Sequence, residues 1–231
     1  MEKNKEFPIR FPELKDEIGL SDILNIDEFQ RLQDLFAEAH GVASLITDPN
    51  GIPITKPGNF TRLCRDFILK SERAYVNCMK SDTIIGRQNH TGPVIQQCMC
   101  EGLRDLGASI TVGGMQIANW TIGQVRNDEF DQEKVLKFAG EIGSGRGEFM
   151  EAYQEVPVML AGQFKKITNV HFAFAKELSE KAYANLQLQN QIAEREKSTY
   201  LLQESETRFQ MLFNHAPLSY NAVKFTQEEV R

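Results

Sequence analysis

The sequence has little of what marks an exported, membrane-spanning or nucleic-acid-binding protein. Its 231 residues carry a net charge of −6, which provides no excess of positive charge to attract nucleic acid or an anionic membrane. Residues 1–6 lack the apolar core of a signal peptide. No stretch reaches the roughly 18 consecutive apolar residues that span a bilayer. We therefore expect a cytoplasmic protein with no membrane segment in this piece and no direct binding of nucleic acid.

Motifs for catalysis and nucleotide binding are also missing. The sequence has no H-E-x-x-H zinc motif, no P-loop and no G-x-S-x-G elbow, and no G-x-G-x-x-G follows a strand. Its 4 histidines are dispersed without i, i+4 pairing, and no nucleophile has an evident base. We therefore expect no enzymatic activity in this piece. The histidines are His40, His90, His171 and His215.

Cysteine is scarce, with 4 residues in the chain. Without a secretory signal, cysteines are more often thiols or ligands than structural disulfides. Their spacing, C-x13-C-x19-C-x-C, matches no common zinc module but does not forbid a site assembled by the fold. Three roles for the cysteines remain open. They are small buried apolar residues, or they contact a ligand or undergo redox chemistry, or they form a metal or iron–sulfur site. The candidate metal ligands are Cys64, Cys78, Cys98 and Cys100.

Hydrophobic periodicity predicts an α+β domain, in which an antiparallel sheet is flanked by helices and a long coiled-coil-like helix follows. Asp27 is the expected N-cap of the first long helix, and Ser81 with Asp82 is expected to cap a later one. Pro53 marks an edge strand in the first hairpin. The expected elements are a helix 27–40, strands 42–47 and 52–55, helices within 59–89, a strand 93–100, strands 108–112 and 115–125, a helix 128–143, a break 143–147 and a long helix from 156.

The stretch 98–114 brings thiols, an acidic residue and a glycine-rich turn close together in the chain. Alternation along a strand would point Cys98 and Cys100 to the same face. No base, metal motif or nucleotide loop accompanies the stretch, so we interpret it as one wall of a small-molecule pocket and the turn that shapes it. Trp120 on the next strand is expected in the core or in the pocket wall, where an aromatic ring serves both purposes.

The last part of the sequence predicts one helix that changes character along its length. Apolar residues at helical spacing between 160 and 178 are expected to pack on the domain. Beyond 178 the apolar pattern thins, which favours a coiled coil that joins two chains in a homodimer. The alternative is a single solvent-exposed helix. The thinned positions are Leu188, Ile192, Thr199, Leu202 and Phe209.

Five short motifs occur in a fixed order: 59–64, 78–82, Cys98 with 102–105, 112–114 and 123–125. As a set they resemble the PocR-type ligand-binding sensor domain, over roughly residues 20–175. The resemblance implies a PAS-like sensory module that binds small hydrocarbon derivatives such as diols. Modules of this kind occur in transcription regulators, histidine kinases and diguanylate cyclases.

Carried over residue by residue, the resemblance places three cysteines and three polar residues at recurring family positions: Cys64, Cys78, Cys98, Asp82, Asp105 and Gln124. Cys100 is not a usual family position, and Arg104 stands where an aromatic residue is common. The predicted ligand-binding residues are Phe60, Cys64, Cys78, Cys98, Asp105, Trp120 and Gln124.

The chain is therefore expected to divide into a flexible arm (1–19), a PocR-like sensory domain (20–175), a helical linker or coiled coil (176–207) and the truncated start of a PAS-like domain (208–231). Residues 204–213 resemble the start of a PAS domain. That resemblance implies the N-terminal part of a multidomain signalling protein, such as a sensor histidine kinase of a two-component system, whose missing output region is a kinase or cyclase.

Three functions remain open from the sequence. The favoured one is a cytoplasmic sensory input domain that binds a small organic molecule, such as a hydrocarbon derivative, and relays the signal through its C-terminal helix. The alternative is a cysteine-based metal, iron–sulfur or redox sensor. A third interpretation is a purely structural dimerisation module. Beyond the cysteine-based alternative, the sequence specifies no cofactor.

Overall fold

The computed structural model describes residues 19–85, 94–99 and 102–215. The chain divides into two compact units, Met1–Leu186 and Gln187–Arg231. The expected flexible arm (apart from Gly19), His90, Cys100 and residues 216–231 lie outside the described residues. The expected boundaries after residues 175 and 207 stay predictions.

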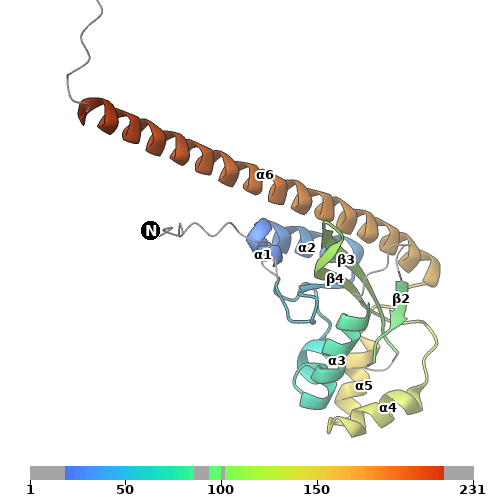
Figure 1. Ribbon diagram of the computed structural model, residues 1–231. Coiled ribbons are helices and arrows are strands. Elements are labelled where there is room, and N and C mark those ends of the chain that lie inside the picture. Colours follow the sequence, from blue (N-terminus) through green and yellow to red (C-terminus); the bar gives the residue numbers. More distant parts are fainter. Residues whose placement is uncertain (1–18, 86–93, 100–101, 216–231) are drawn as a thin grey trace, which may run out of the picture. The chain divides into compact units, whose positions relative to one another are not determined.

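A four-stranded antiparallel sheet forms the centre of the first unit (Figure 1). A tight turn at Gly113 and Gly114 joins its two longest strands. The predicted class, an antiparallel sheet flanked by helices with a long C-terminal helix, is confirmed. The strands are β1 (Ala43–Thr47), β2 (Val94–Gln97), β3 (Arg104–Val112) and β4 (Met115–Val125), in the spatial order β1-β4-β3-β2.

Helices on one face of the sheet bury a hydrophobic cluster that includes Trp120 and Phe36. These helices are α1 (Leu20–Ile23), α2 (Ile26–His40) and the first part of α6 (Ala161–His215), as Figure 1 shows.

Other helices bury a second hydrophobic cluster, which includes Cys64 and Phe149. Within this group α3 packs on β3 and β4 (Figure 1). The group consists of η1, a short π-helix (Cys64–Ile68), α3 (Glu72–Ile85), α4 (Gln132–Glu141) and α5 (Arg146–Gln154).

Two predicted helix starts are wrong. The N-cap of α2 is Asn25, whose side-chain oxygen accepts a hydrogen bond from the backbone N–H of Asp27 at 3.0 Å. Ser81 and Asp82 lie inside α3, because the helix runs unbroken over Glu72–Ile85. Ser, Asn and Asp all accept backbone N–H groups readily, so their presence alone does not show which residue begins a helix.

Two predicted strands are shorter than expected. Residues 52–55 form a bridge between Pro53 and Thr47 rather than a strand, because proline has no N–H to donate to a ladder. β2 ends at Gln97, and Cys98 follows the strand, with its N–H donating to the Leu103 carbonyl at 2.8 Å.

The connection between β4 and α6 contains a helix that the sequence pattern did not predict. α4 ends at Glu141, and α5 begins at Arg146, inside the expected break at 143–147. α6 begins at Ala161 rather than near residue 156. Pro157 accounts for the late start, because the residue before a proline is pushed out of the helical region. Val158, the residue after Pro157, forms a bridge to Arg126, which directly follows β4.

α6 passes from the first unit into the second. Its first turns bury Phe164, Ile167, Leu178 and Ala182 in the cluster around Trp120. Within residues 19–85, 94–99 and 102–215, no helix combines the length and apolar character needed to cross a membrane. Beyond Leu186 the helix exposes apolar side chains, among them Leu188, Ile192, Leu202, Phe209 and Phe213.

Candidate ligand-binding site

A β-bulge near the end of β4 creates the geometry of the site. Arg104 pairs with Val125 and Leu106 with Ile122, so two residues of β4 lie opposite the single residue Asp105. A bulge of this kind redirects the strand and its side chains. The second of the two residues, Gln124, has a φ of 53°, a left-handed conformation that is uncommon for a residue with a side chain and often accompanies functional sites.

The bulge is stabilised by the Asp105 side chain. Its Oδ1 accepts a hydrogen bond from the backbone N–H of Gln124 at 2.8 Å. Gly123 permits this approach, because a Cβ on that residue would lie 2.6 Å from the Arg104 carbonyl oxygen and 2.7 Å from the Asp105 Cα. Backbone atoms at these distances cannot move aside cheaply, so this position requires glycine.

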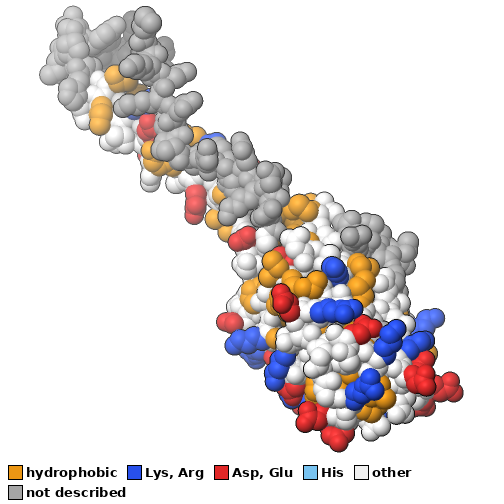
Figure 2. All heavy atoms as spheres, turned by 90° about the horizontal axis from the view of Figure 1, so that it is seen from below, with side chains coloured by type: hydrophobic (Ala, Val, Ile, Leu, Met, Phe, Trp, Pro, Cys, Tyr) orange, Lys and Arg blue, Asp and Glu red, His pale blue; other side chains and the backbone are white. Residues whose placement is uncertain are grey.

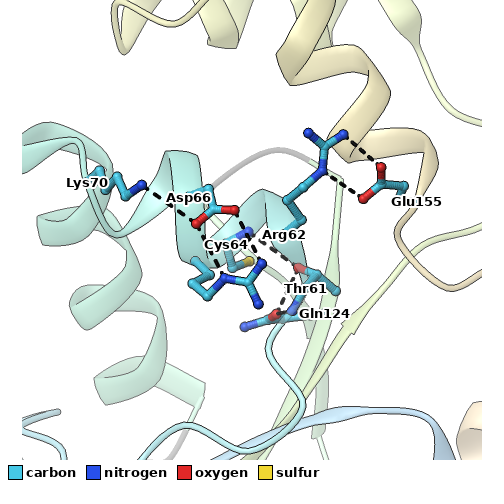
Figure 3. A network of polar contacts seen from close by, with 8 residues as sticks. Thr61, Arg62, Cys64, Asp66, Lys70, Gln124 and Glu155 are labelled. Carbon is cyan, nitrogen blue, oxygen red and sulfur yellow. Dashed lines mark hydrogen bonds and ion pairs between the residues drawn. The ribbon is translucent and has the colours of Figure 1, made fainter.

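The Gln124 side chain connects the bulge to the start of η1 (Figure 3). Its Oε1 accepts hydrogen bonds from the backbone N–H and the hydroxyl of Thr61, each at 2.9 Å. The Thr61 hydroxyl in turn accepts the N–H of Cys64 at 3.3 Å. These hydrogen bonds connect the backbone N–H of Cys64 to the bulged end of the sheet through Thr61 and Gln124.

A small cavity lies between the bulged end of the sheet, η1 and α3. Its volume, counted as the space open to the centre of a water molecule, is about 40 Å³. One water needs roughly 10–15 Å³ on this measure, so the cavity suits a few waters or a ligand of a few heavy atoms. Its lining residues are Ala43, Ser44, Leu45, Phe60, Cys64, Ile68, Cys78, Asp82, Cys98, Asp105, Thr121, Ile122, Gly123 and Gln124.

α3 brings a second carboxyl to this cavity. The helix comes close to β3 at Gly107, where an added Cβ would lie 2.8 Å from the Ile85 carbonyl oxygen. This close packing holds Asp82 of α3 near Asp105 of β3. The pKa of Asp82 is raised to about 7, first because partial burial removes hydration and second because Asp105 repels its charged form.

Burial also raises the pKa of the Asp105 carboxyl. Hydrogen bonds from the Gln124 N–H and the Cys98 thiol act in the opposite direction. Among the described residues that line the cavity, none is Lys, Arg or His. The cavity therefore holds two neighbouring acidic groups and no basic partner from its own described wall.

The cavity also brings three thiols together, those of Cys64, Cys78 and Cys98. In the described part of the chain, no group of three or more His, Cys, Asp or Glu side chains has the geometry to hold a metal ion. The fourth candidate metal ligand, Cys100, lies outside the described residues. The structure therefore shows a thiol-lined wall, not a preformed metal centre in the described part.

Trp120 is the one predicted ligand-binding residue that does not line the cavity, and it lies on the face of the sheet opposite the cavity. Side chains alternate along a strand, so Thr121 faces the cavity and Trp120 faces α2 and α6. The Trp120 N–H donates to the Ser44 hydroxyl at 2.7 Å, and its ring centroid lies 4.8 Å from that of His171. The other six predicted residues line the cavity, and ligand binding by any of them stays a prediction.

Thr121 and Ile68 also line the cavity and were not among the predicted ligand-binding residues. Strand alternation around Trp120 was a sufficient signal for Thr121. The family resemblance and the expected helix cap pointed to Asp82, and no local signal in the sequence placed it beside Asp105.

Comparison with known proteins identifies the class. A family model described as "Sensory domain found in PocR" matches residues 22–183, so this part of the chain is a sensory domain. The chain belongs to the PocR sensory-domain family. No curated protein and no solved structure matches it.

Proposed function

We propose that this chain is a cytoplasmic sensory input domain whose cavity binds a small organic molecule, such as a hydrocarbon derivative. The observation that carries the proposal is the cavity itself, which combines polar and apolar walls in a family of sensory domains. We also propose that the domain performs no catalysis, and that the bound molecule is read by its effect on packing.

Signal relay from the cavity to α6 is supported by contacts that pass through the sheet. Ser44 contributes to the cavity wall from β1, and its hydroxyl accepts the indole N–H of Trp120 on the other face. Trp120 packs edge-on against His171 of α6. A ligand that moves β1 against β4 would therefore change how α6 packs. A differential affinity worth about 1–3 kcal/mol between two packings is sufficient for such coupling.

We propose that the far part of α6 forms a coiled coil in a homodimer and passes the change to an output domain. Exposed Leu188, Ile192, Leu202 and Phe209 follow heptad spacing and would be buried by a second helix. The proposed order is a sensory domain, a linker at 176–207 and a PAS-like domain from 208, as in a sensor histidine kinase of a two-component system.

Direct binding of nucleic acid is not part of the proposal. On the face shown in Figure 2, Lys and Arg side chains are interspersed with Asp and Glu side chains over the described surface, without a continuous basic patch. The net charge of −6 agrees with that distribution.

A thermal-shift screen of short diols, alcohols and organic acids tests the proposal. Cys78→Phe should fill the cavity from α3, whereas Val76→Phe places the same ring on the exposed side of the same helix. We expect at least one compound to raise the melting temperature of the wild-type protein and of Val76→Phe, but not of Cys78→Phe. An equal response in both variants would place binding outside the cavity.

A cysteine-based redox or metal sensor is the second candidate, and the three thiols on one wall support it. Protein purified without oxygen would then carry iron, zinc or a visible chromophore. Metal-free, colourless protein whose ligand response survives serine at all four cysteine positions would rule this candidate out.

A further inference from the structure

The charge of the cavity wall restricts the class of molecule that the proposed sensor can bind. The wall contains Asp82 from α3 and Asp105 from β3, two elements that are separate in sequence. No described lining residue is basic. An anionic ligand would add a third acidic group to this space, and like charges at close range are strongly unfavourable.

We infer that the ligand is a small organic cation, such as a short primary ammonium ion, held by Asp82 and Asp105. The inference rests on the proposed function and names the ligand class for the same cavity.

The hydrogen bonds at the two carboxyls favour this class. Asp105 already accepts from the Gln124 N–H and the Cys98 thiol. Burial and repulsion by Asp105 raise the pKa of Asp82 and so favour its neutral form. No hydrogen bond from the described residues offsets this change in pKa. A primary ammonium provides three N–H donors and one positive charge. The described wall of the cavity offers these two carboxyls no positively charged donor.

The remainder of the wall fits the carbon part of such an ion. The half-buried Phe60 offers an aromatic ring, which attracts cations at its face, and Ile68 is apolar. The cavity volume of about 40 Å³ limits the ligand to a few heavy atoms. Ethanolamine, which combines a short carbon chain with one ammonium group, is a suitable probe.

Proton linkage distinguishes a cation from a neutral ligand. A cation stabilises the charged carboxylates, so binding releases a proton wherever the empty cavity holds one. Affinity for ethanolamine should therefore rise with pH, by up to about tenfold per pH unit. A neutral diol leaves the charge unchanged and should show no such rise. Among the described residues that line the cavity with Asp82 and Asp105, the other titratable groups are the thiols of Cys64, Cys78 and Cys98. A window of about pH 6 to 7.5 stays below the ordinary thiol pKa of about 8.5.

Calorimetric titration of the full 231-residue protein with three compounds of similar size provides the test. The compounds are ethanolamine, ethylene glycol and glycolate, which are cationic, neutral and anionic. We expect ethanolamine to bind at least tenfold more tightly than ethylene glycol near pH 7.5, and glycolate not to bind. Asp82→Asn should reduce ethanolamine affinity at least tenfold and weaken its dependence on pH, because the Asp105 carboxyl, whose pKa is also raised by burial, remains in the cavity. Asp128→Asn, which changes an exposed carboxylate outside the cavity, should leave both unchanged.

Each outcome separates the two proposals. Binding of ethylene glycol with no preference for ethanolamine overturns the cation and leaves the proposed sensor function intact. The proposal of a cationic ligand is also overturned if the affinity for ethanolamine does not vary with pH. The pH dependence can be measured on the wild-type protein alone, so the test does not require Asp82→Asn to fold. If none of these compounds and none of the diols, alcohols and acids binds, both proposals fail.

Discussion

Replacing His171 by leucine should stabilise the domain. His171 lies on α6 and is fully buried between the rings of Trp120 and Phe36, whose centroids are 4.8 and 5.7 Å from its own. Neither ring nitrogen has a hydrogen-bond partner among the described residues. The imidazole therefore gives up its hydrogen bonds to water on folding, and no described residue replaces them.

The expected gain follows from that loss. An unsatisfied buried polar group costs about 1–3 kcal/mol, and leucine removes the cost at nearly the same side-chain volume. The free energy of unfolding of His171→Leu should rise by about 1–3 kcal/mol. At about 2–4 °C per kcal/mol for a domain of this size, the melting temperature should rise by about 2–12 °C.

The gain should increase as the solution becomes more acidic. Burial lowers the pKa of His171 from 6.5 to about 3, so below pH 6.5 the unfolded chain binds a proton that the folded domain does not bind. Stability is therefore lost as pH falls from about 6.5 towards 3, by up to about 1.4 kcal/mol per unit from this group. Leucine cannot bind that proton, so the difference between variant and wild type should be larger near pH 5 than near pH 7.5.

Urea denaturation at these two pH values measures the effect. His40→Leu is the matched control, because His40 is partly exposed and its Nδ1 makes a hydrogen bond with the Phe36 carbonyl oxygen at 2.9 Å. His40→Leu should give no gain. A His171→Leu protein that is less stable than wild type, or whose difference is the same at both pH values, would refute the reasoning, because a buried water would then satisfy the imidazole.

Three further predictions concern the bulge, the acidic pair and the C-terminal helix. Gly123→Ala should lower the free energy of unfolding by about 1–3 kcal/mol in denaturation experiments, because its Cβ would meet backbone atoms. Gly140→Ala, which has open space around it, should raise the free energy of unfolding by about 0.4–1 kcal/mol, and equal effects of the two changes would contradict the bulge geometry. The folded-state pKa of Asp82 is raised, so its contribution to stability falls as pH rises from 3.8 to about 7. The Asp82→Asn protein should therefore have a higher melting temperature than wild type near pH 8, but not near pH 4. If the proposed coiled-coil dimer forms, Leu202→Asp should convert it to a monomer in analytical ultracentrifugation, whereas Leu201→Asp, outside the heptad seam, should not. An unchanged mass for both variants would contradict the proposed coiled coil.

Local chemistry predicted the elements whose signals lie within a few residues. The helical spacing around Phe29 and Phe36 and the glycine pair at 113 and 114 were sufficient to predict α2 and the turn between β3 and β4. The ordered motifs were sufficient to recognise the family that matches residues 22–183. Where several local signals competed, as for the cap of α2 or the start of α6, the sequence pattern chose the wrong residue by two to five positions.

The candidate site shows where local reasoning ends. Regular alternation would place Trp120 and Gln124 on the same face of β4. The bulge places one extra residue between them, so Gln124 reaches the cavity while Trp120 packs against α6. The extra residue is visible only once the register of β3 against β4 is known.

By itself, then, the sequence predicted the α+β class, the family and six of the fourteen described residues that line the cavity. Tertiary structure alone decided that Asp82 lies beside Asp105 and that His171 is buried with no hydrogen-bond partner among the described residues. The physical reason is that charge repulsion and loss of hydration depend on distances between atoms far apart in the chain. Those distances follow from the packing of α3 and α6 on the sheet, which no short stretch of sequence specifies.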